Sequence, residues 1–496
     1  MFKRVLIANR GEIANRIIST CLDLGIETVA IYSDDDRSLH YLNRADYVYR
    51  VGEGDASLSY KNREAVLAIA KMAEVDCIHA GYGFLAEDKD FARLCKENKI
   101  EFIGSSYELL KNSENKIAIR ELAEKLGIKT VPHFKKAVSE VIVAEQEAKK
   151  LGYPVMIKPV CGLHGRGVRR VEDPKLLGQA FSATKIEASV VLDNDLILIE
   201  KALDGAKHIE VPVLRDKSGH ILALPELDCS VQRFYTKIVA ETPASSINEK
   251  TRDLLRTSAF KIAEKIDLVG LATFEFLVKD EDVYFLEMTP RLTVEHSVTE
   301  MVTGFDLVKY QFIVSAGDSL DVYEKGLKCR GTAMQCRIYA EDPQNFEPYS
   351  GVVDDLFVPM GPYVRHELIA HSGWTVPIHY DHMLAKMSVW GRNRGMVIRK
   401  MTHLLKDYFY SGIITNIPLQ RQIFSHKSLI SGTYNVDFMR KDFVFNRQEL
   451  PQNYDTAMTI AAAIRVFKKE EKIRGTKEFI SEPISTWQKE LGTGRL

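Results

Sequence analysis

The 496-residue sequence is poor in the features that define several protein classes. It has only seven cysteines, an odd number with no C-x-x-C pair, which argues against a disulfide framework or a structural zinc site. No apolar run approaches the length of about 18 residues expected for a membrane span. The first apolar stretch, residues 5–8, is too short for a secretory signal peptide. These absences predict a cytoplasmic protein without a membrane partner.

The chain also lacks an excess of charge of either sign. Lys and Arg number 67 against 68 for Asp and Glu, which gives a formal net charge of −1. Proteins that bind nucleic acid usually carry a strongly basic domain or stripe, so we expect no nucleic-acid partner. With 45% hydrophobic and 27% charged residues, the composition is typical of globular proteins. At roughly 150 residues per domain, the length predicts about three domains.

The first hundred residues alternate between strand and helix patterns. Residues 4–8 and 27–32 are short, mostly apolar strands, and residues 12–24 between them have apolar side chains at helical spacing. This order predicts a βαβ unit with parallel strands. The turn after the first strand, residues 9–12, has a single glycine and no GxGxxG motif, which argues against a dinucleotide site.

Three further features favour an anionic ligand. The loop GYGFL at residues 81–85 follows a strand, at the edge where α/β sheets bind ligands. Ser113 as the N-cap of a helix to Leu126 would place Lys116 in the first turn, against the helix dipole. Lys158 ends the strand 154–159, and the glycine-rich loop after it, residues 161–168, is able to fold over phosphates. A surface lysine and a hairpin turn remain the alternative interpretations.

A hairpin at residues 271–288 argues for a metal ion. Two apolar strands flank a three-residue polar turn, residues 280–282, which would place Glu275 directly opposite Glu287. Like charges in this position are destabilising, and burial of each carboxylate costs several kcal/mol. A divalent cation removes the conflict, since Mg²⁺ is usually held by one or two carboxylates and substrate phosphates. The alternative is an edge hairpin with both glutamates in solvent.

Arg291 and Glu295 follow this hairpin and are four residues apart. An arginine can hold an anion, and a nearby carboxylate can remove its proton. The alternative is an ordinary surface ion pair.

With these motifs in view, the chain resembles biotin carboxylase, the ATP-grasp component of biotin-dependent carboxylases. From Lys3 to about Phe445 it has the family's blocks in order: ANRGEIA, GYGFL, GYPVMIK, DCSVQR, TFEFL, VEHSVTEM, CRIYAEDP and GIITN. The resemblance implies an α/β fold. Its parts would be a doubly wound parallel-sheet (pre-ATP-grasp) domain at 1–113, an ATP-grasp domain at 114–318 with a mobile lid at about 131–203, an α+β C-terminal domain at 319–445, and a C-terminal extension at 446–496.

The resemblance also implies roles for individual residues, with ATP and Mg²⁺ (or Mn²⁺) as cofactors. The ATP site would comprise Lys116, Lys158, the lid glycines Gly162, Gly165 and Gly167, and the adenine-binding Glu200, Lys201, Leu203, His208 and Gln232. Glu275 and Glu287 would bind the metal. Lys237, Arg291 and Val294 would hold bicarbonate, Glu295 would deprotonate it, and Arg337 would stabilise the biotin enolate with Tyr82 near the ring.

The implied reaction is ATP- and bicarbonate-dependent carboxylation of biotin through carboxyphosphate. The sequence has no Met-Lys-Met biotinylation motif, so the biotin would be attached to a separate biotin carboxyl carrier protein. A carboxyltransferase subunit of an acyl-CoA or pyruvate carboxylase would be a second partner. Arg16, Tyr363 and Arg365 fall where the family's homodimer interface lies.

Several positions depart from the family pattern. Cys161, Leu163 and His164 interrupt the glycine lid, and Thr293 replaces a glutamine of the bicarbonate pocket. Other changed positions are Thr289, Pro290 and Tyr235. A lost hydrogen bond to a charged ligand is worth about 1.5–3 kcal/mol, which weakens binding without abolishing chemistry. Two alternatives follow: an ATP-grasp ligase for another carboxylic acid, or a catalytically weakened paralogue with a structural role in a carboxylase complex.

Overall fold

The computed structural model describes residues 2–161, 165, 167–192, 195–320 and 327–447, and residues 459, 460, 463, 464, 466 and 467. The chain divides into two units, Met1–Phe445 and Asn446–Leu496. The second unit has eight described residues: Asn446 and Arg447 are not helical, and the other six are. The remainder of the predicted C-terminal extension lies outside the described residues. All sheets of the described chain belong to the first unit.

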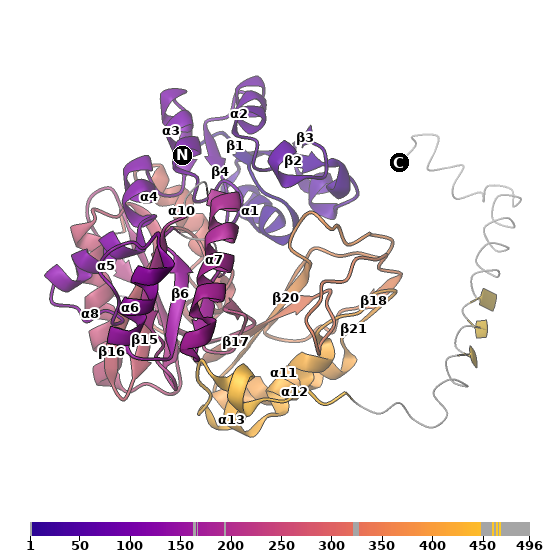
Figure 1. Cartoon of the computed structure of the whole chain (residues 1–496). Coiled ribbons are helices and arrows are strands. Elements are labelled where there is room, and N and C mark those ends of the chain that lie inside the picture. Colours follow the sequence, from indigo (N-terminus) through magenta and orange to yellow (C-terminus); the bar gives the residue numbers. More distant parts are fainter. Residues whose placement is uncertain are drawn as a thin grey trace, which may run out of the picture. The chain divides into compact units, whose positions relative to one another are not determined.

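The N-terminal part of the first unit is a five-stranded parallel sheet in the order β3-β2-β1-β4-β5 (Figure 1). The strands are β1 (Arg4–Ile7), β2 (Glu27–Ser33), β3 (Tyr47–Gly52), β4 (Cys77–His79) and β5 (Glu101–Ile103). The helices are α1 (Gly11–Leu24), α2 (Arg63–Met72) and α3 (Lys89–Glu97). The predicted βαβ unit is confirmed, since β1 and β2 pair in parallel and α1 connects them.

A smaller antiparallel sheet follows, in the order β7-β6-β8. Its strands are β6 (Val155–Pro159), β7 (Arg169–Val171) and β8 (Ile197–Lys201), packed against α6 (Val141–Leu151) and α7 (Leu177–Leu192) (Figure 1). Residues 130–138 connect this sheet to the body, because Thr130 bridges to Phe285 at one end and Val138 to Ile197 at the other.

Two helices, α4 (Tyr107–Ser113) and α5 (Lys116–Lys125), precede the small sheet. The predicted N-cap was wrong: Ser113 is the last residue of α4, and Asn115 caps α5 by accepting hydrogen bonds from the amides of Ile117 and Ala118. Both an asparagine and a serine side chain can cap a helix, so the sequence alone did not distinguish them. Lys116 nevertheless begins α5, as predicted.

The largest sheet has nine strands, with β10 paired to β9 and the others in the order β16-β15-β9-β11-β14-β17-β20-β19. These strands are β9 (Lys207–Arg215), β10 (Ile221–Ala223), β11 (Leu227–Asp228), β14 (Val239–Thr242), β15 (Gly270–Lys279), β16 (Asp282–Thr289), β17 (Thr332–Tyr339), β19 (Val364–Leu368) and β20 (Met383–Gly391). The sheet continues across residue 319, because β14 pairs with β17. The ATP-grasp and C-terminal sequence segments therefore share one sheet.

The helices around this sheet are α8 (Glu249–Lys265), α9 (His296–Thr303), α10 (Leu307–Ser315), α11 (Arg394–Asp407), α12 (Ile417–Ser425) and α13 (Lys427–Ser431). Two short antiparallel pairs complete the fold: β12 (Gln232–Arg233) with β13 (Thr236–Lys237), and β18 (Asp355–Phe357) with β21 (Phe409–Ser411). None of the described helices has the length and apolar character needed to cross a membrane.

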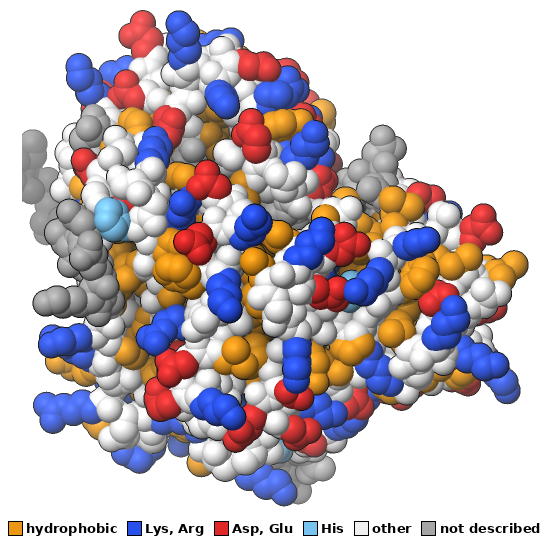
Figure 2. All heavy atoms as spheres, turned by 90° about the vertical axis from the view of Figure 1, so that its left-hand side faces the viewer, with side chains coloured by type: hydrophobic (Ala, Val, Ile, Leu, Met, Phe, Trp, Pro, Cys, Tyr) orange, Lys and Arg blue, Asp and Glu red, His pale blue; other side chains and the backbone are white. Residues whose placement is uncertain are grey.

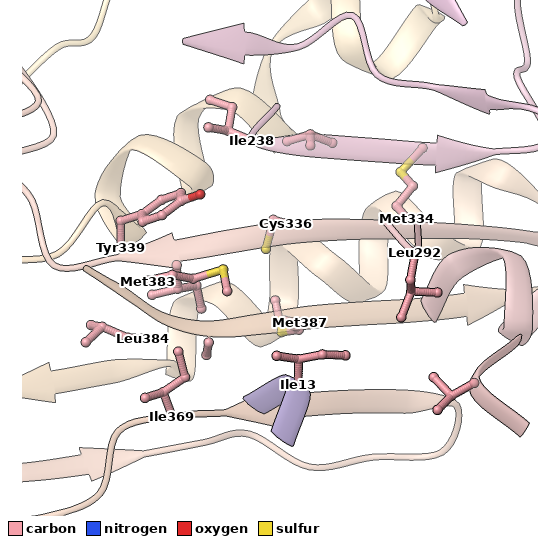
Figure 3. Close-up of a cluster of buried hydrophobic side chains, with 14 of the residues drawn as sticks. Ile13, Ile238, Leu292, Met334, Cys336, Tyr339, Ile369, Met383, Leu384 and Met387 are labelled. Atoms are coloured by element: carbon pink, nitrogen blue, oxygen red, sulfur yellow. The ribbon is translucent and has the colours of Figure 1, made fainter. Parts of the chain in front are cut away.

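The main hydrophobic core joins all three sequence segments. Ile13 of α1 packs with Leu292 and with Met334, Cys336 and Met387 from the large sheet (Figure 3). On the face shown in Figure 2, side chains of both charge signs are interspersed with apolar ones. The shared core makes the N-terminal, central and C-terminal segments one packed unit.

The β15–β16 hairpin differs in one detail from the prediction. The turn contains two residues, Asp280 and Glu281, which both have positive φ values (49° and 69°), and Lys279 pairs with Asp282. A bulge after Glu275 shifts the register by one residue, so Glu275 still pairs with Glu287. The predicted turn length was wrong, but the predicted pairing of the two glutamates is confirmed.

Candidate active site

Three glutamates form a row across adjacent strands of the large sheet. Glu275 on β15 lies directly opposite Glu287 on β16 and directly opposite Glu210 on β9. Residues paired in this way lie on the same face of a sheet. Glu210 is fully buried and Glu275 is 4% exposed, so this face concentrates negative charge inside the protein.

Nearby donors and cations balance this charge. His208 Nε2 lies 2.8 Å from Glu275 Oε2, and Gln232 Nε2 donates to His208 Nδ1 at 2.7 Å, which leaves the Nε2 proton for the glutamate. Lys237 Nζ is 3.1 Å from the same Glu275 oxygen and forms an ion pair with Glu210. Burial would raise the pKa of Glu275, but Lys237 and His208 lower it well below the usual carboxyl value.

Thr289 adds a hydrogen bond to this cluster. Its Oγ1 donates to Glu275 Oε1 at 2.8 Å. This side chain is one of the departures from the family pattern, and it orients a carboxylate that is predicted to bind the metal. The substitution therefore keeps a polar contact at this position.

Two glutamates of the row, Glu210 and Glu275, fit a divalent cation. Ligand atoms of His208, Glu210 and Glu275 all lie within 4.8 Å of one another. Oε2 of Glu210 is buried without a hydrogen-bond partner, a costly arrangement that a cation would relieve. Carboxylate oxygens are the ligands that Mg²⁺ prefers. Glu287, the second predicted ligand, is the in-register neighbour of Glu275.

The two lysines predicted to contact ATP phosphates approach this row from different elements. Lys116, at the start of α5, places Nζ 2.9 Å from Glu287 Oε2. Lys158, on β6 of the small sheet, places Nζ 2.5 Å from Glu200 Oε1, while Arg120 lies 2.6 Å from Oε2 of the same carboxylate. Burial would raise the pKa of Glu200, but the two cations lower it to about 2. Each of the two lysines therefore has a carboxylate partner.

The predicted adenine-binding stretch lies at the end of β8. Glu200 is 2% exposed, and the Lys201 amide donates to Pro132 O at 2.7 Å. The Lys201 side chain donates to Gly152 O at 2.7 Å. Leu203 lies in the loop after β8, where its carbonyl accepts a hydrogen bond from Ala206. Contacts to the backbone oxygens of Pro132 and Gly152 therefore hold Lys201 in place.

The glycine-rich loop is described only in part, since Gly162, Leu163 and His164 lie outside the described residues. Gly165 and Gly167 have φ values of 86° and 70°, which a residue with a side chain rarely adopts. A Cβ at Gly165 would approach the backbone oxygen of Tyr235 to 3.3 Å. The Tyr235 hydroxyl in turn contacts Met156 Sδ of β6 at 3.9 Å. Tyr235 thus links the large-sheet side to the small sheet.

Of the predicted bicarbonate residues, Arg291 and Val294 lie just beyond β16, and Lys237 lies on β13. Arg291 Nε donates to Glu87 Oε1 at 2.6 Å. Glu295, at the start of α9, is 2% exposed and forms an ion pair with Arg337 on β17. Burial would raise the pKa of Glu295, but Arg337 and Lys237 lower it. The carboxylate is therefore ionised at neutral pH, as a proton acceptor must be.

The backbone around Glu295 is anchored from several sides. Thr293 O accepts from the His296 amide at 3.3 Å and lies 2.9 Å from His296 Nδ1. Lys386 Nζ donates to Val294 O at 3.1 Å and to the Tyr82 hydroxyl at 3.4 Å. Tyr82 and Val294, which the resemblance assigns to different substrates, therefore share one buried cation.

The residues expected at a homodimer interface lie near α1 and α9. Arg16 and Arg365 both pair with Glu300, at 3.0 and 2.6 Å. The Tyr363 side chain is 65% exposed and its ring packs against Trp390 at 4.8 Å.

Four polar residues at this site were missed from the sequence: Glu210, Arg120, Glu87 and Lys386. Glu210 had a signal, because His208 and Glu210 are two residues apart in a strand whose interior is otherwise apolar, and so lie on one face. The other three act through partners far away in the sequence, and nothing local marks them.

Models of known protein families match three segments of the chain. A model of the biotin carboxylase N-terminal domain matches residues 1–110, and one of the biotin carboxylase C-terminal domain matches residues 335–441. A model of the ATP-binding domain of the carbamoyl-phosphate synthase L chain matches residues 115–323.

Similar proteins match along nearly their whole length. Biotin carboxylase of Haemophilus influenzae is 39% identical over 447 residues, covering 90% of this chain and 100% of that protein. Biotin carboxylase 2 of Bacillus subtilis is 40% identical over 442 residues, covering 89% and 100%. The biotin carboxylase domain of Hydrogenobacter thermophilus 2-oxoglutarate carboxylase, solved as a dimer with MgADP, ADP and bicarbonate, has a TM-score of 0.87 at 36% identity, covering 90% of this chain and 100% of that one.

The fold and these matches define an ATP-grasp ligase. Within that class, the chain belongs to the biotin carboxylase family. The family and the fold class predicted from the sequence motifs are thereby confirmed.

Proposed function

We propose that this chain carboxylates biotin at the expense of ATP and bicarbonate, with the biotin attached to a separate carrier protein. The observation that carries the proposal is the buried ion pair between Glu295 and Arg337. The charge of Lys237 also acts on Glu295, and the charge of Glu295 acts on Glu210 of the carboxylate row. This arrangement puts an ionised base beside cations that can hold an anionic substrate.

The carboxylate row and the lysines would bind the nucleotide. Glu275 and Glu287 would hold Mg²⁺, which when bound neutralises phosphate charge. Lys116 and Lys158 would leave their present carboxylate partners to contact phosphate oxygens. Since phosphoryl transfer depends mostly on positioning and charge stabilisation, these residues would lower the barrier without covalent chemistry.

The remaining residues would act on bicarbonate and biotin. Lys237, Arg291 and the Val294 backbone would orient bicarbonate while Glu295 takes its proton, so that its oxygen attacks the γ-phosphorus and ADP leaves. The carboxyphosphate formed breaks down to CO₂ and phosphate, and the phosphate removes the N1′ proton of biotin. Arg337 would stabilise the resulting enolate, whose N1′ attacks CO₂ to give carboxybiotin.

Further partners follow from the same proposal. The carboxyl group would pass to a carboxyltransferase subunit, and two copies of this chain would form a homodimer around Arg16, Tyr363 and Arg365. The similar 2-oxoglutarate carboxylase domain was solved as a dimer, which supports this assembly.

The direct test measures ADP release by the full-length chain. We expect release that requires both Mg²⁺ and bicarbonate and that free biotin stimulates. Omitting bicarbonate while ATP binding is verified provides the control. Turnover that appears only with a different carboxylic acid, or ATP binding without biotin-stimulated turnover, would refute the proposal.

A further inference from the structure

A single buried lysine joins four segments behind the proposed bicarbonate and biotin pocket. Lys386 lies on β20, and its side chain is fully buried. Its Nζ lies 3.3 Å from Glu12 Oε1 of α1 and 3.0 Å from Glu367 Oε2 of β19. The two remaining contacts, to Val294 O and the Tyr82 hydroxyl, come from the loops that the family resemblance assigns to the bicarbonate and biotin sites.

Two of the partners of Lys386 are carboxyl groups, and the other two are neutral acceptors. An ammonium group has three protons to donate, and a buried one is stable only when charged or polar acceptors surround it. Burial would raise the pKa of Glu367, but Lys386 and Arg365 lower it, so Glu367 supplies the main negative charge beside the ammonium. Burial raises the pKa of Glu12 to about 7, and its carboxyl group adds a second acceptor. Val294 and Tyr82 contribute no charge, so they are the groups that the ammonium orients.

The contact to Val294 has a direct consequence for the proposed base. The Val294 carbonyl belongs to the same planar peptide unit as the Glu295 amide. Holding that oxygen at 3.1 Å therefore sets the orientation of the peptide from which the Glu295 side chain leaves. The same Nζ lies 5.5 Å from the centre of the Tyr82 ring, a distance at which the cation and the ring attract each other.

The position of β20 itself does not depend on these polar contacts. Its neighbouring residues Leu384 and Met387 belong to the large hydrophobic core, together with Ile13 and Ile369 (Figure 3). Apolar packing thus holds the strand, while the Lys386 head group reaches the two substrate loops.

We propose that Lys386 is a positioning residue for the carboxylation reaction. It fixes the Val294–Glu295 peptide and the Tyr82 ring relative to each other, and so aligns the bicarbonate and biotin sites. This inference rests on the proposed function and adds to it a residue that touches neither ATP nor the metal.

The test uses the double variant Glu12→Gln/Lys386→Met in the full-length chain. This pair of changes leaves the net charge unaltered and avoids an unpaired carboxylate at Glu12, while Glu367 keeps its ion pair with Arg365. Glu241→Gln/Arg394→Met is the matched control, since it removes another buried ion pair, with an N–O distance of 2.8 Å, away from both substrate loops.

The expected result separates the substrates. In the double variant, kcat/KM for bicarbonate and for biotin falls about 10- to 100-fold, the scale expected when reacting groups are misplaced by about 1 Å. The KM for ATP stays within about two-fold of wild type, because no contact of Lys386 reaches the nucleotide residues. Unchanged constants for bicarbonate and biotin, or an equal loss for all three substrates, would overturn the inference.

A wild-type chain without turnover would refute the proposed function but would not test the role of Lys386. A crystal structure of the double variant tests that role separately. We expect a rotated Val294–Glu295 peptide and a displaced Tyr82 ring in the variant. Both groups in their wild-type positions would overturn the positioning role whatever the activity.

Discussion

Replacing Glu295 by glutamine tests the proposed base in the most specific way. Glutamine keeps the size of the side chain but removes the charge that accepts a proton. General base catalysis contributes about 10²- to 10⁴-fold to a rate, or about 2.7–5.4 kcal/mol of the activation barrier. We expect bicarbonate-dependent ADP release to fall by that factor, while the affinity for ATP stays near the wild-type value.

The structure predicts a second effect of the same variant on stability. The 9%-exposed Arg337 would lose its carboxylate partner and keep a contact to the Tyr339 hydroxyl at 3.4 Å. Breaking a buried ion pair by removing one partner costs about 3–5 kcal/mol. A loss of activity must therefore be separated from a loss of folded protein.

Glu241→Gln separates the two effects. Glu241 is 1% exposed and pairs with Arg394 at 2.8 Å, so the control removes a comparable buried charge. The assay compares ADP release with the folded fraction measured by urea unfolding of both variants. The reasoning is refuted if Glu295→Gln keeps more than about a tenth of wild-type turnover, or if the control loses as much activity per folded molecule.

Three further outcomes are expected. Thr289→Val removes the hydrogen bond to Glu275 and should raise the Mg²⁺ concentration for half-maximal turnover about 10- to 100-fold, as loss of a group that orients a metal ligand does; an unchanged Mg²⁺ titration would contradict this. Arg120→Met removes the guanidinium that pairs with Glu200 and donates to Leu286 O. Urea unfolding should show that the free energy of unfolding falls by up to about 3–5 kcal/mol. An unaltered unfolding midpoint would show that Arg120 does not stabilise the fold. Burial lowers the pKa of His79 to about 3, below the usual value near 6.5. As the pH falls through 6.5, His79 therefore binds a proton in the unfolded state but not in the folded state. This group should lower the free energy of unfolding by about 2 kcal/mol between pH 6.5 and 5, and His79→Asn should lose that part of the pH dependence, whereas equal slopes would disprove the assignment.

The strands and helices with clear periodicity were predictable from the sequence. The β1–α1–β2 unit and the two strands of the β15–β16 hairpin follow from local patterns of apolar residues. The length of the hairpin turn did not follow, because Asp280 and Glu281 adopt positive φ values that neither residue type signals clearly. The pairing of Glu275 with Glu287 survived because the bulge compensates for the shorter turn.

The site was predictable where its residues lie in recognisable motifs. Lys116, Lys158 and Glu295 are in segments with their own signals or in blocks that resemble the family. Arg120 and Lys386 have no such signal, since their partners come from strands and loops far away in the sequence. Burial of a charged group is decided by the tertiary fold, and a local pattern cannot express it.

We propose that Glu275 and Glu287 hold one metal ion beside the nucleotide. A crystal structure with Mg²⁺ and a non-hydrolysable ATP analogue measures this directly. We expect one ion coordinated by both carboxylates at about 2.1 Å, with phosphate oxygens completing its shell. Nucleotide bound with the two carboxylates turned apart, and no ion between them, would contradict it.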